Sequence, residues 1–72
     1  MPLNLADTNT PYIIQKICGK EDQRHYLESL GLVENTPICI LSSFFGYYVV
    51  RVRESKIGIS TELAKTIIVQ SE

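Results

Sequence analysis

The 72-residue sequence carries 7 Lys and Arg against 8 Asp and Glu, for a net charge of −1 at pH 7, and 44% of its residues are hydrophobic. This composition is that of a small globular chain, neither disordered nor membrane-like, and we expect one domain over residues 1–72. No apolar run approaches the roughly 20 residues of a transmembrane helix. The N-terminus also lacks the basic segment followed by an apolar segment that is typical of a signal peptide. We therefore expect a cytoplasmic protein that does not insert into membranes. The slightly acidic balance argues against nucleic acid as a partner, because phosphate-binding domains carry a basic excess.

The first predicted strand covers Tyr12 to Cys18, which is rich in β-forming residues and ends at Gly19. Its pattern changes phase along its length, because Tyr12 and Ile14 share one face and Ile17 belongs to the other. Either both faces are buried or a β-bulge lies between Ile14 and Ile17.

A helix of about three turns is predicted next, starting at Lys20-Glu21-Asp22, where Asp22 or one of the residues before it can cap the first amides. Leu27 and Leu30 lie three residues apart and form an apolar stripe. Gly31 follows where a helix end favours a residue that adopts positive φ without strain. We expect the remaining strands to form a sheet that receives this helix.

The rest of the chain predicts strands at 38–42, 48–53, 56–59 and 66–69, with a single helical turn at 61–64 that Ser60 can cap. In the second of these strands Tyr48, Val50 and Val52 face one side while Arg51 and Arg53 face the other. Five short strands, one short helix after the first strand and one turn before the last predict a mainly β fold. We expect a small closed SH3-like barrel, in which closure removes free strand edges.

This order of motifs resembles the FeoA family, the ferrous iron transport protein A, whose domain also occurs at the C-terminus of some iron-dependent repressors. The resemblance spans nearly the whole chain and depends on the order and spacing of its motifs. The matching residues are Leu3, Leu5, Ile14, Ile17, Gly19, Arg24, Leu27, Leu30, Gly31, Leu32, Ile57, Ile59, Ala64, Ile67 and Val69.

The resemblance implies an SH3-like barrel, no catalytic residues, and a role as a cytosolic partner of FeoB, the large membrane GTPase that carries ferrous iron. The sequence departs from the family pattern at two places. Glu34 and Asn35 stand where the family usually has Pro-Gly, and Asn also tolerates positive φ. Ser60 or Thr61 stands where an arginine is frequent.

Four aromatic residues lie close together between the second and third predicted strands: Phe44, Phe45, Tyr47 and Tyr48. Aromatic side chains at a hairpin tip are typical anchors of protein interfaces, and aromatic grooves accept proline-rich peptides. These four residues are the predicted partner-binding site. The alternative is that a phenylalanine plugs the barrel end and Tyr48 packs in the sheet.

The soft metal ligands are Cys18, His25 and Cys39, and their spacing does not predict a metal site. We expect both cysteines to be reduced thiols and His25 to be solvated. A nucleophile needs an oriented base beside it, and the lone His25 has no such partner in the pattern. The glycines form no phosphate-binding loop. The sequence therefore predicts neither an enzyme nor a metal or cofactor site.

Arg51, Arg53 and Lys56 form a basic set that could contact an acidic partner or lipid head groups, although a solvated strand face is the simpler explanation. The leading hypothesis is a non-catalytic module that docks on the cytosolic region of an FeoB-like permease and modulates it. The alternative is an SH3-like adaptor that binds a proline-rich segment. Because the chain starts at Met1 without a DNA-binding segment, we expect the first.

A third hypothesis is a barrel that stacks nucleotide bases on Phe44, Phe45 and Tyr47, which the acidic balance of the chain disfavours. The sequence leaves the oligomeric state open. An exposed aromatic patch can hold two copies together as readily as it binds another protein.

Overall fold

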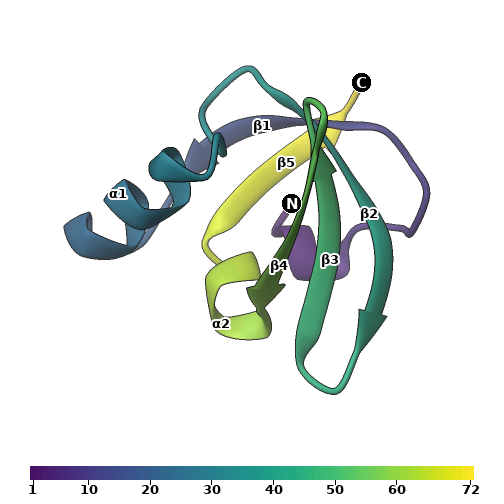
Figure 1. The fold of residues 1–72 in the computed structure, drawn as a ribbon. Helices are drawn as coiled ribbons and strands as arrows, with labels where there is room; N and C mark the ends of the chain where they lie inside the picture. The colour runs from purple at the N-terminus through teal and green to yellow at the C-terminus, as the bar shows by residue number, and fades with distance from the viewer.

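The computed structural model describes all 72 residues and contains one antiparallel sheet with the strand order β4-β3-β2-β1-β5 (Figure 1). The elements are the 3-10 helix η1 (Leu3–Leu5), β1 (Tyr12–Ile17), α1 (Glu21–Ser29), β2 (Pro37–Phe44), β3 (Tyr47–Val52), β4 (Ser55–Ser60), α2 (Thr61–Ala64) and β5 (Ile67–Ser71). The predicted mainly β, SH3-like architecture with one short helix and a single turn before the last strand is confirmed.

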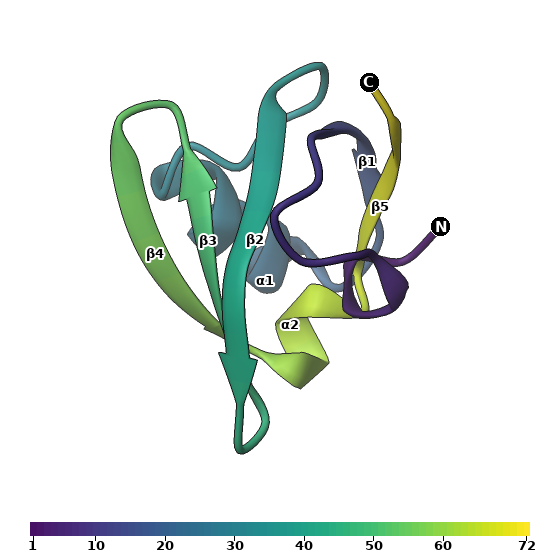
Figure 2. The same cartoon turned by 90° about the vertical axis from the view of Figure 1, so that its right-hand side faces the viewer.

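The sheet is folded into two walls, β4-β3-β2 and β1-β5 (Figure 2). They meet where β1 and β2 pair, at only two positions, Tyr12 with Ile38 and Ile13 with Pro37. Beyond this point β2 leaves β1, and the N-terminal lead-in replaces it: the N–H of Asn9 donates to the carbonyl of Ile40 at 2.7 Å.

The expectation that strand pairing closes the barrel is wrong, because β4 and β5 do not pair with each other. The chain start protects β5 instead: the amino group of Met1 donates to the carbonyl of Val69, and the N–H of Val69 donates to the carbonyl of Met1, both at 2.7 Å. The short helix α2 connects β4 to β5 (Figure 1). The outer edge of β4 remains unpaired.

Thirteen side chains form one hydrophobic core, and most of them come from the inward positions of the strands. The core residues are Leu3, Tyr12, Ile14, Leu27, Leu32, Ile38, Ile40, Val50, Val52, Ile59, Ala64, Ile67 and Val69. Of the two explanations for the phase change in β1, the structure shows the bulge, since the register against β5 shifts between Ile14 and Lys16. A second register shift, between Ile40 and Ser42 of β2, was not predicted.

Helix α1 packs on the sheet less extensively than we expected. Leu27 is its only buried residue, so the helix attaches to one end of the core through a single main anchor. The helix starts where we expected, and its cap is one of the residues before Asp22: Lys20 is the N-cap residue, and its N–H donates to Oε1 of Gln23 at 3.1 Å. Asp22 lies inside the helix, where its Oδ1 accepts the N–H of Gln23.

The predicted end of the helix is confirmed. Gly31 has φ of +93°, and its N–H donates to the carbonyl of Glu28. The N–H of Leu32 donates to the carbonyl of Leu27 at 3.0 Å, which completes a Schellman motif. This turn buries Leu32 completely in the core.

Two predicted turns lie elsewhere than expected. Strand β2 continues to Phe44 and β3 begins at Tyr47, so the turn between them has only two residues. The next turn is Arg53–Glu54 rather than Glu54–Ser55, because Ser55 already pairs with β3. Arg53 therefore has positive φ, 58°, and is not on a strand face.

Candidate protein-docking surface

The β2–β3 hairpin ends in a two-residue turn of Phe45 and Gly46, with φ of 44° and 77°. Positive φ at both central residues defines the type I′ turn, whose twist matches that of the flanking strands. Phe44 and Tyr47 form the last cross-strand pair before this turn. The exposed fractions of Phe44, Phe45 and Tyr47 are 56%, 99% and 54%.

The structure brings three of the four predicted site residues together on the surface and separates the fourth. Tyr48 points to the core side, where it is half-buried, and its hydroxyl donates to the carbonyl of Asn4 at 3.3 Å. Tyr48 therefore has a structural role, as the alternative explanation expected for it. We name Phe44, Phe45 and Tyr47 the aromatic tip.

Phe45 is strained without a structural benefit from its ring. Left-handed backbone costs roughly 1–2 kcal/mol for a residue with a Cβ, and Asn or Gly is favoured at this turn position. The side chain recovers nothing by burial, since it is almost fully exposed. A strained, exposed aromatic residue is a reason to look for a function at that point.

The turn that carries the aromatic tip is hydrogen-bonded to the start of α2. The N–H of Thr61, the first residue of α2, donates to the carbonyl of Gly46 at 2.9 Å. Ser60 caps α2 by accepting the N–H of Leu63 on Oγ at 3.3 Å, as predicted. The backbone of the turn is thus fixed to the β4–α2 junction. This reduces the conformational entropy that the turn would lose on binding a partner.

The predicted basic set lies at the other end of the same face. Arg51 and Lys56 are exposed and directly opposite each other on β3 and β4, and Arg53 follows in the turn. Cys39 of β2 is opposite Arg51 on the other side. Cys39, Arg51 and Arg53 border a cleft of about 290 Å³, whose other lining residues are Pro11, Pro37, Ile38 and Glu72. The sequence did not predict this cleft.

A second, more polar groove of about 420 Å³ lies beside α1. Its lining residues are Ile17, Arg24, Glu28, Val33 and Glu34. The groove thus holds one cation, Arg24, and two carboxylates, Glu28 and Glu34.

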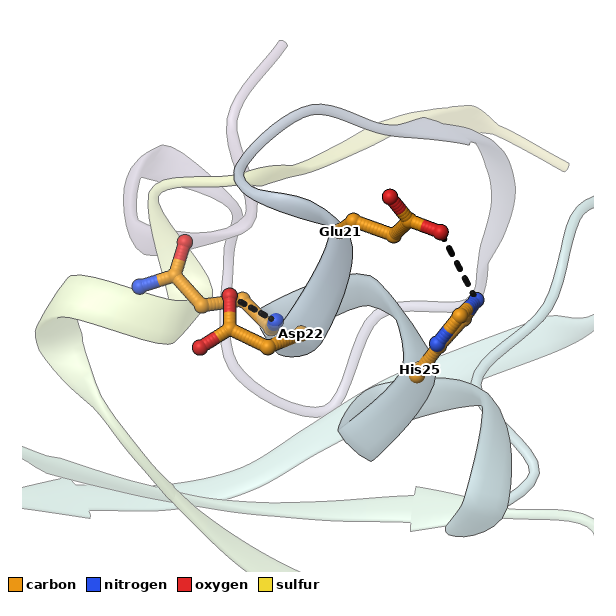
Figure 3. A network of polar contacts seen from close by, with 4 residues as sticks. Glu21, Asp22 and His25 are labelled. Carbon is orange, nitrogen blue, oxygen red and sulfur yellow. Dashed lines mark hydrogen bonds and ion pairs between the residues drawn. The ribbon is translucent and has the colours of Figure 1, made fainter.

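The three soft ligands are on separate elements. Cys18 follows β1, Cys39 is on β2, and neither forms a disulfide. His25 lies on α1, with its Nε2 3.9 Å from Oε1 of Glu21 one turn earlier (Figure 3). Both side chains are mostly exposed, so this pair contributes little to stability. No group of three or more His, Cys, Asp or Glu side chains is placed to hold a metal ion.

Comparison with known proteins agrees with this geometry. The family model named FeoA domain matches residues 1–71. A crystal structure described as an iron uptake regulatory protein (FeoA) is 27% identical, with a TM-score of 0.90 over 97% of this chain and 95% of that chain. The FeoA-like protein from Clostridium acetobutylicum is 20% identical, with a TM-score of 0.89 over 99% of this chain and 85% of that one.

The same fold also occurs as part of a longer chain. The structure of ScaR with bound Zn²⁺ is 26% identical, with a TM-score of 0.88 over all of this chain but only 37% of that chain. No curated protein matches the chain by sequence. No helix in the structure is long and apolar enough to cross a membrane.

The five-stranded antiparallel sheet with a single helical turn before its last strand defines the class of small SH3-like domains. The match over residues 1–71 then gives the family: the chain belongs to the FeoA family of non-catalytic accessory proteins of ferrous iron transport. The resemblance seen in the sequence is confirmed.

Proposed function

We propose that this chain is a cytoplasmic accessory protein that docks on the cytosolic region of an FeoB-like ferrous iron permease and modulates its GTPase activity or assembly. The aromatic tip makes the contact. The single observation that carries the proposal is Phe45, which is 99% exposed at a positive φ of 44°. Folding alone favours Asn or Gly there, so a strained and exposed phenylalanine supports a contact with another surface.

Three features support the aromatic tip as an anchor. Aromatic side chains bury large areas at low entropic cost, and a few of them supply most of the energy of many interfaces. Phe44 and Tyr47 flank the turn on one face of the sheet, so a partner can cover both rings together. The main-chain bond from Thr61 to Gly46 holds the tip in place before the partner arrives.

The test is an amide-resolved NMR titration with the soluble GTPase region of the permease at low and moderate salt. The proposal predicts shifts concentrated at residues 43–48 that persist at moderate salt, since apolar contacts are not screened. Shifts concentrated on α1, or none at several hundred micromolar partner, would contradict it; the latter corresponds to a binding free energy weaker than about −5 kcal/mol.

An adaptor role is the second candidate. Its support is the similarity to a segment of ScaR over the whole of this chain. In this role the chain binds a proline-rich segment in polyproline conformation against aromatic side chains. A synthetic peptide of eight prolines distinguishes the two roles: the adaptor role predicts binding that Tyr47→Ala weakens, and the docking role predicts none.

A further inference from the structure

Strand β4 is the one strand whose long outer edge has no partner. The edge of β5 is paired with the N-terminus through Met1 and Val69, and β2 receives Asn9 where it leaves β1. Strand β4 pairs only with β3 and forms the outer margin of its wall (Figure 2). Unpaired edges are ready to accept a further strand, and native proteins normally cover them.

The register shows which backbone groups of this edge are free. The bond from the N–H of Thr61 to the carbonyl of Gly46 places Ser60 in a pair without mutual hydrogen bonds. Because such pairs alternate along an antiparallel ladder, Gly58 and Lys56 occupy equivalent positions. The N–H and carbonyl groups of Lys56 and Gly58, together with the N–H of Ser60, therefore point away from β3.

The charge beside this edge is unbalanced. Arg51 and Lys56 are cross-strand neighbours in one of the closely spaced pairs, where like charges destabilise a sheet. Neither forms an ion pair, since Glu21 and His25 make the only one in the structure. Two acids lie nearby, Glu54 in the β3–β4 turn and Glu72 at the cleft, and neither is within 4 Å of a cation. A carboxylate between Arg51 and Lys56 would relieve the repulsion.

We infer that the β4 edge binds an extended, acidic segment of the partner protein, which adds a strand to the sheet and places a carboxylate over Arg51 and Lys56. This inference rests on the proposed docking function and names the chemistry of the docked segment. Main-chain hydrogen bonds supply affinity in this mode, and alternate side chains supply specificity. A Cβ added at Gly58 would have no atom within 4 Å, so the face beside the edge is open for those side chains.

The edge and the aromatic tip belong to one surface. Tyr47, Val49 and Arg51 share the outer face of β3, because residues two apart lie on the same side of a strand. The aromatic tip is therefore at one end of this face, and the cations are at the other end. A strand along β4 reaches both ends. Its carboxylates lie near Arg51 and Lys56, and its apolar residues lie near Tyr47.

The experiment uses the full chain and a blocked eight-residue peptide of alternating threonine and glutamate at millimolar concentration, with a threonine–lysine peptide as the charge control. Amide exchange and chemical shifts are read by NMR. We expect the acidic peptide to slow exchange at Lys56, Gly58 and Ser60 at least tenfold. The lysine peptide should leave these amides unchanged. Equal effects of both peptides, or unchanged exchange at these three amides, would overturn the inference.

Two variants of Gly58 separate the edge from the fold. Gly58→Pro removes only the donor that points away from β3, whereas Gly58→Ala keeps it, so the first should abolish peptide binding and the second should retain it. If Gly58→Pro does not fold, Lys56→Glu replaces it and should weaken binding at least tenfold. Retained binding in the folded proline variant, or in Lys56→Glu, would overturn the inference.

The peptide assay needs no permease, so the two proposals fail separately. If the permease region shifts the aromatic tip and the peptide leaves β4 unchanged, only the edge inference is lost. If the peptide binds the edge and the permease region does not bind, the docking function is lost.

Discussion

Phe45 and Gly46 are consecutive left-handed residues at the tip of the β2–β3 hairpin, with φ of 44° and 77°. Gly46 adopts this conformation freely and Phe45 does not. Phe45 is also the most exposed large hydrophobic residue of the protein. Stability and the proposed partner binding therefore favour different residues at this position.

Phe45→Asn tests this conflict directly. Asn-Gly is the favoured type I′ turn, so we expect the free energy of unfolding to rise by about 0.5–1 kcal/mol. Partner affinity should fall in the same variant, because an aromatic anchor is lost. Urea denaturation and the titration with the GTPase region measure the two effects. A variant that gains stability and binds as well as wild type would show that the ring has no role in docking.

Leu27→Ala tests the attachment of α1. Leu27 is fully buried and is the only buried residue of the helix, so we expect a loss of about 2–5 kcal/mol. Tyr26→Ala is the matched control, since Tyr26 is 53% exposed on the same helix and should change stability by less than about 0.5 kcal/mol. Equal effects of the two changes would contradict the single-anchor description.

Tyr12→Phe tests a bond that joins the lead-in to the core. The N–H of Asp7 donates to the Tyr12 hydroxyl at 2.9 Å, and Tyr12 is almost fully buried. Removal of the hydroxyl leaves that amide without its acceptor, so we expect a loss of about 1–2 kcal/mol. Tyr48→Phe should have a smaller effect, because the hydroxyl of Tyr48 donates over a longer 3.3 Å. Thermal unfolding of both variants compares the bonds.

Gly31→Ala and Gly58→Ala form a matched pair of glycine substitutions. Gly31 ends α1 with φ of +93°, so alanine there should destabilise the protein by about 1–2 kcal/mol. Gly58 has no positive φ and faces open space, so alanine there should be neutral or stabilise by a few tenths of a kcal/mol. If Gly58→Ala destabilised the protein more than Gly31→Ala, the positive φ of Gly31 would not be what requires glycine there.

Ferrous iron titration tests the prediction that no metal site is present. His25 lies on the exposed side of α1 with Glu21 as its only charged neighbour in an ion pair. We expect equimolar ferrous iron to leave the His25 ring signals in place under anaerobic conditions. A stoichiometric shift or broadening confined to His25 would show that the residue is a ligand.

Much of the core was predictable from alternation. Val50 and Val52 of β3 and Ile38 and Ile40 of β2 are buried because residues two apart share one face of a strand. The helix end was equally clear, since Gly31 was the one residue there suited to positive φ. Local rules sufficed for these elements because the determinants lie within a few residues.

The features that the sequence did not reveal depend on distant pairing or on unusual turn residues. The hydrogen bonds between Met1 and Val69 join residues 68 positions apart, and no local pattern encodes them. Phe45 and Arg53 are not typical of positive φ, which moved both hairpin turns from their expected positions. For the candidate site, the sequence grouped four aromatics, although alternation along the strand already put Tyr48 on the face of Val50 and Val52. The bond from the Tyr48 hydroxyl to Asn4 agrees with that structural role.

The most direct test of the docking function compares the affinity of the GTPase region for wild type, Phe45→Ala/Tyr47→Ala and Tyr26→Ala. Tyr26 and Tyr47 are exposed to nearly the same extent, 53% and 54%, so Tyr26→Ala controls for the loss of an exposed aromatic ring. We expect the double variant to lose at least tenfold in affinity, about 1.4 kcal/mol, and Tyr26→Ala to lose none. Unchanged affinity in a folded double variant would contradict it.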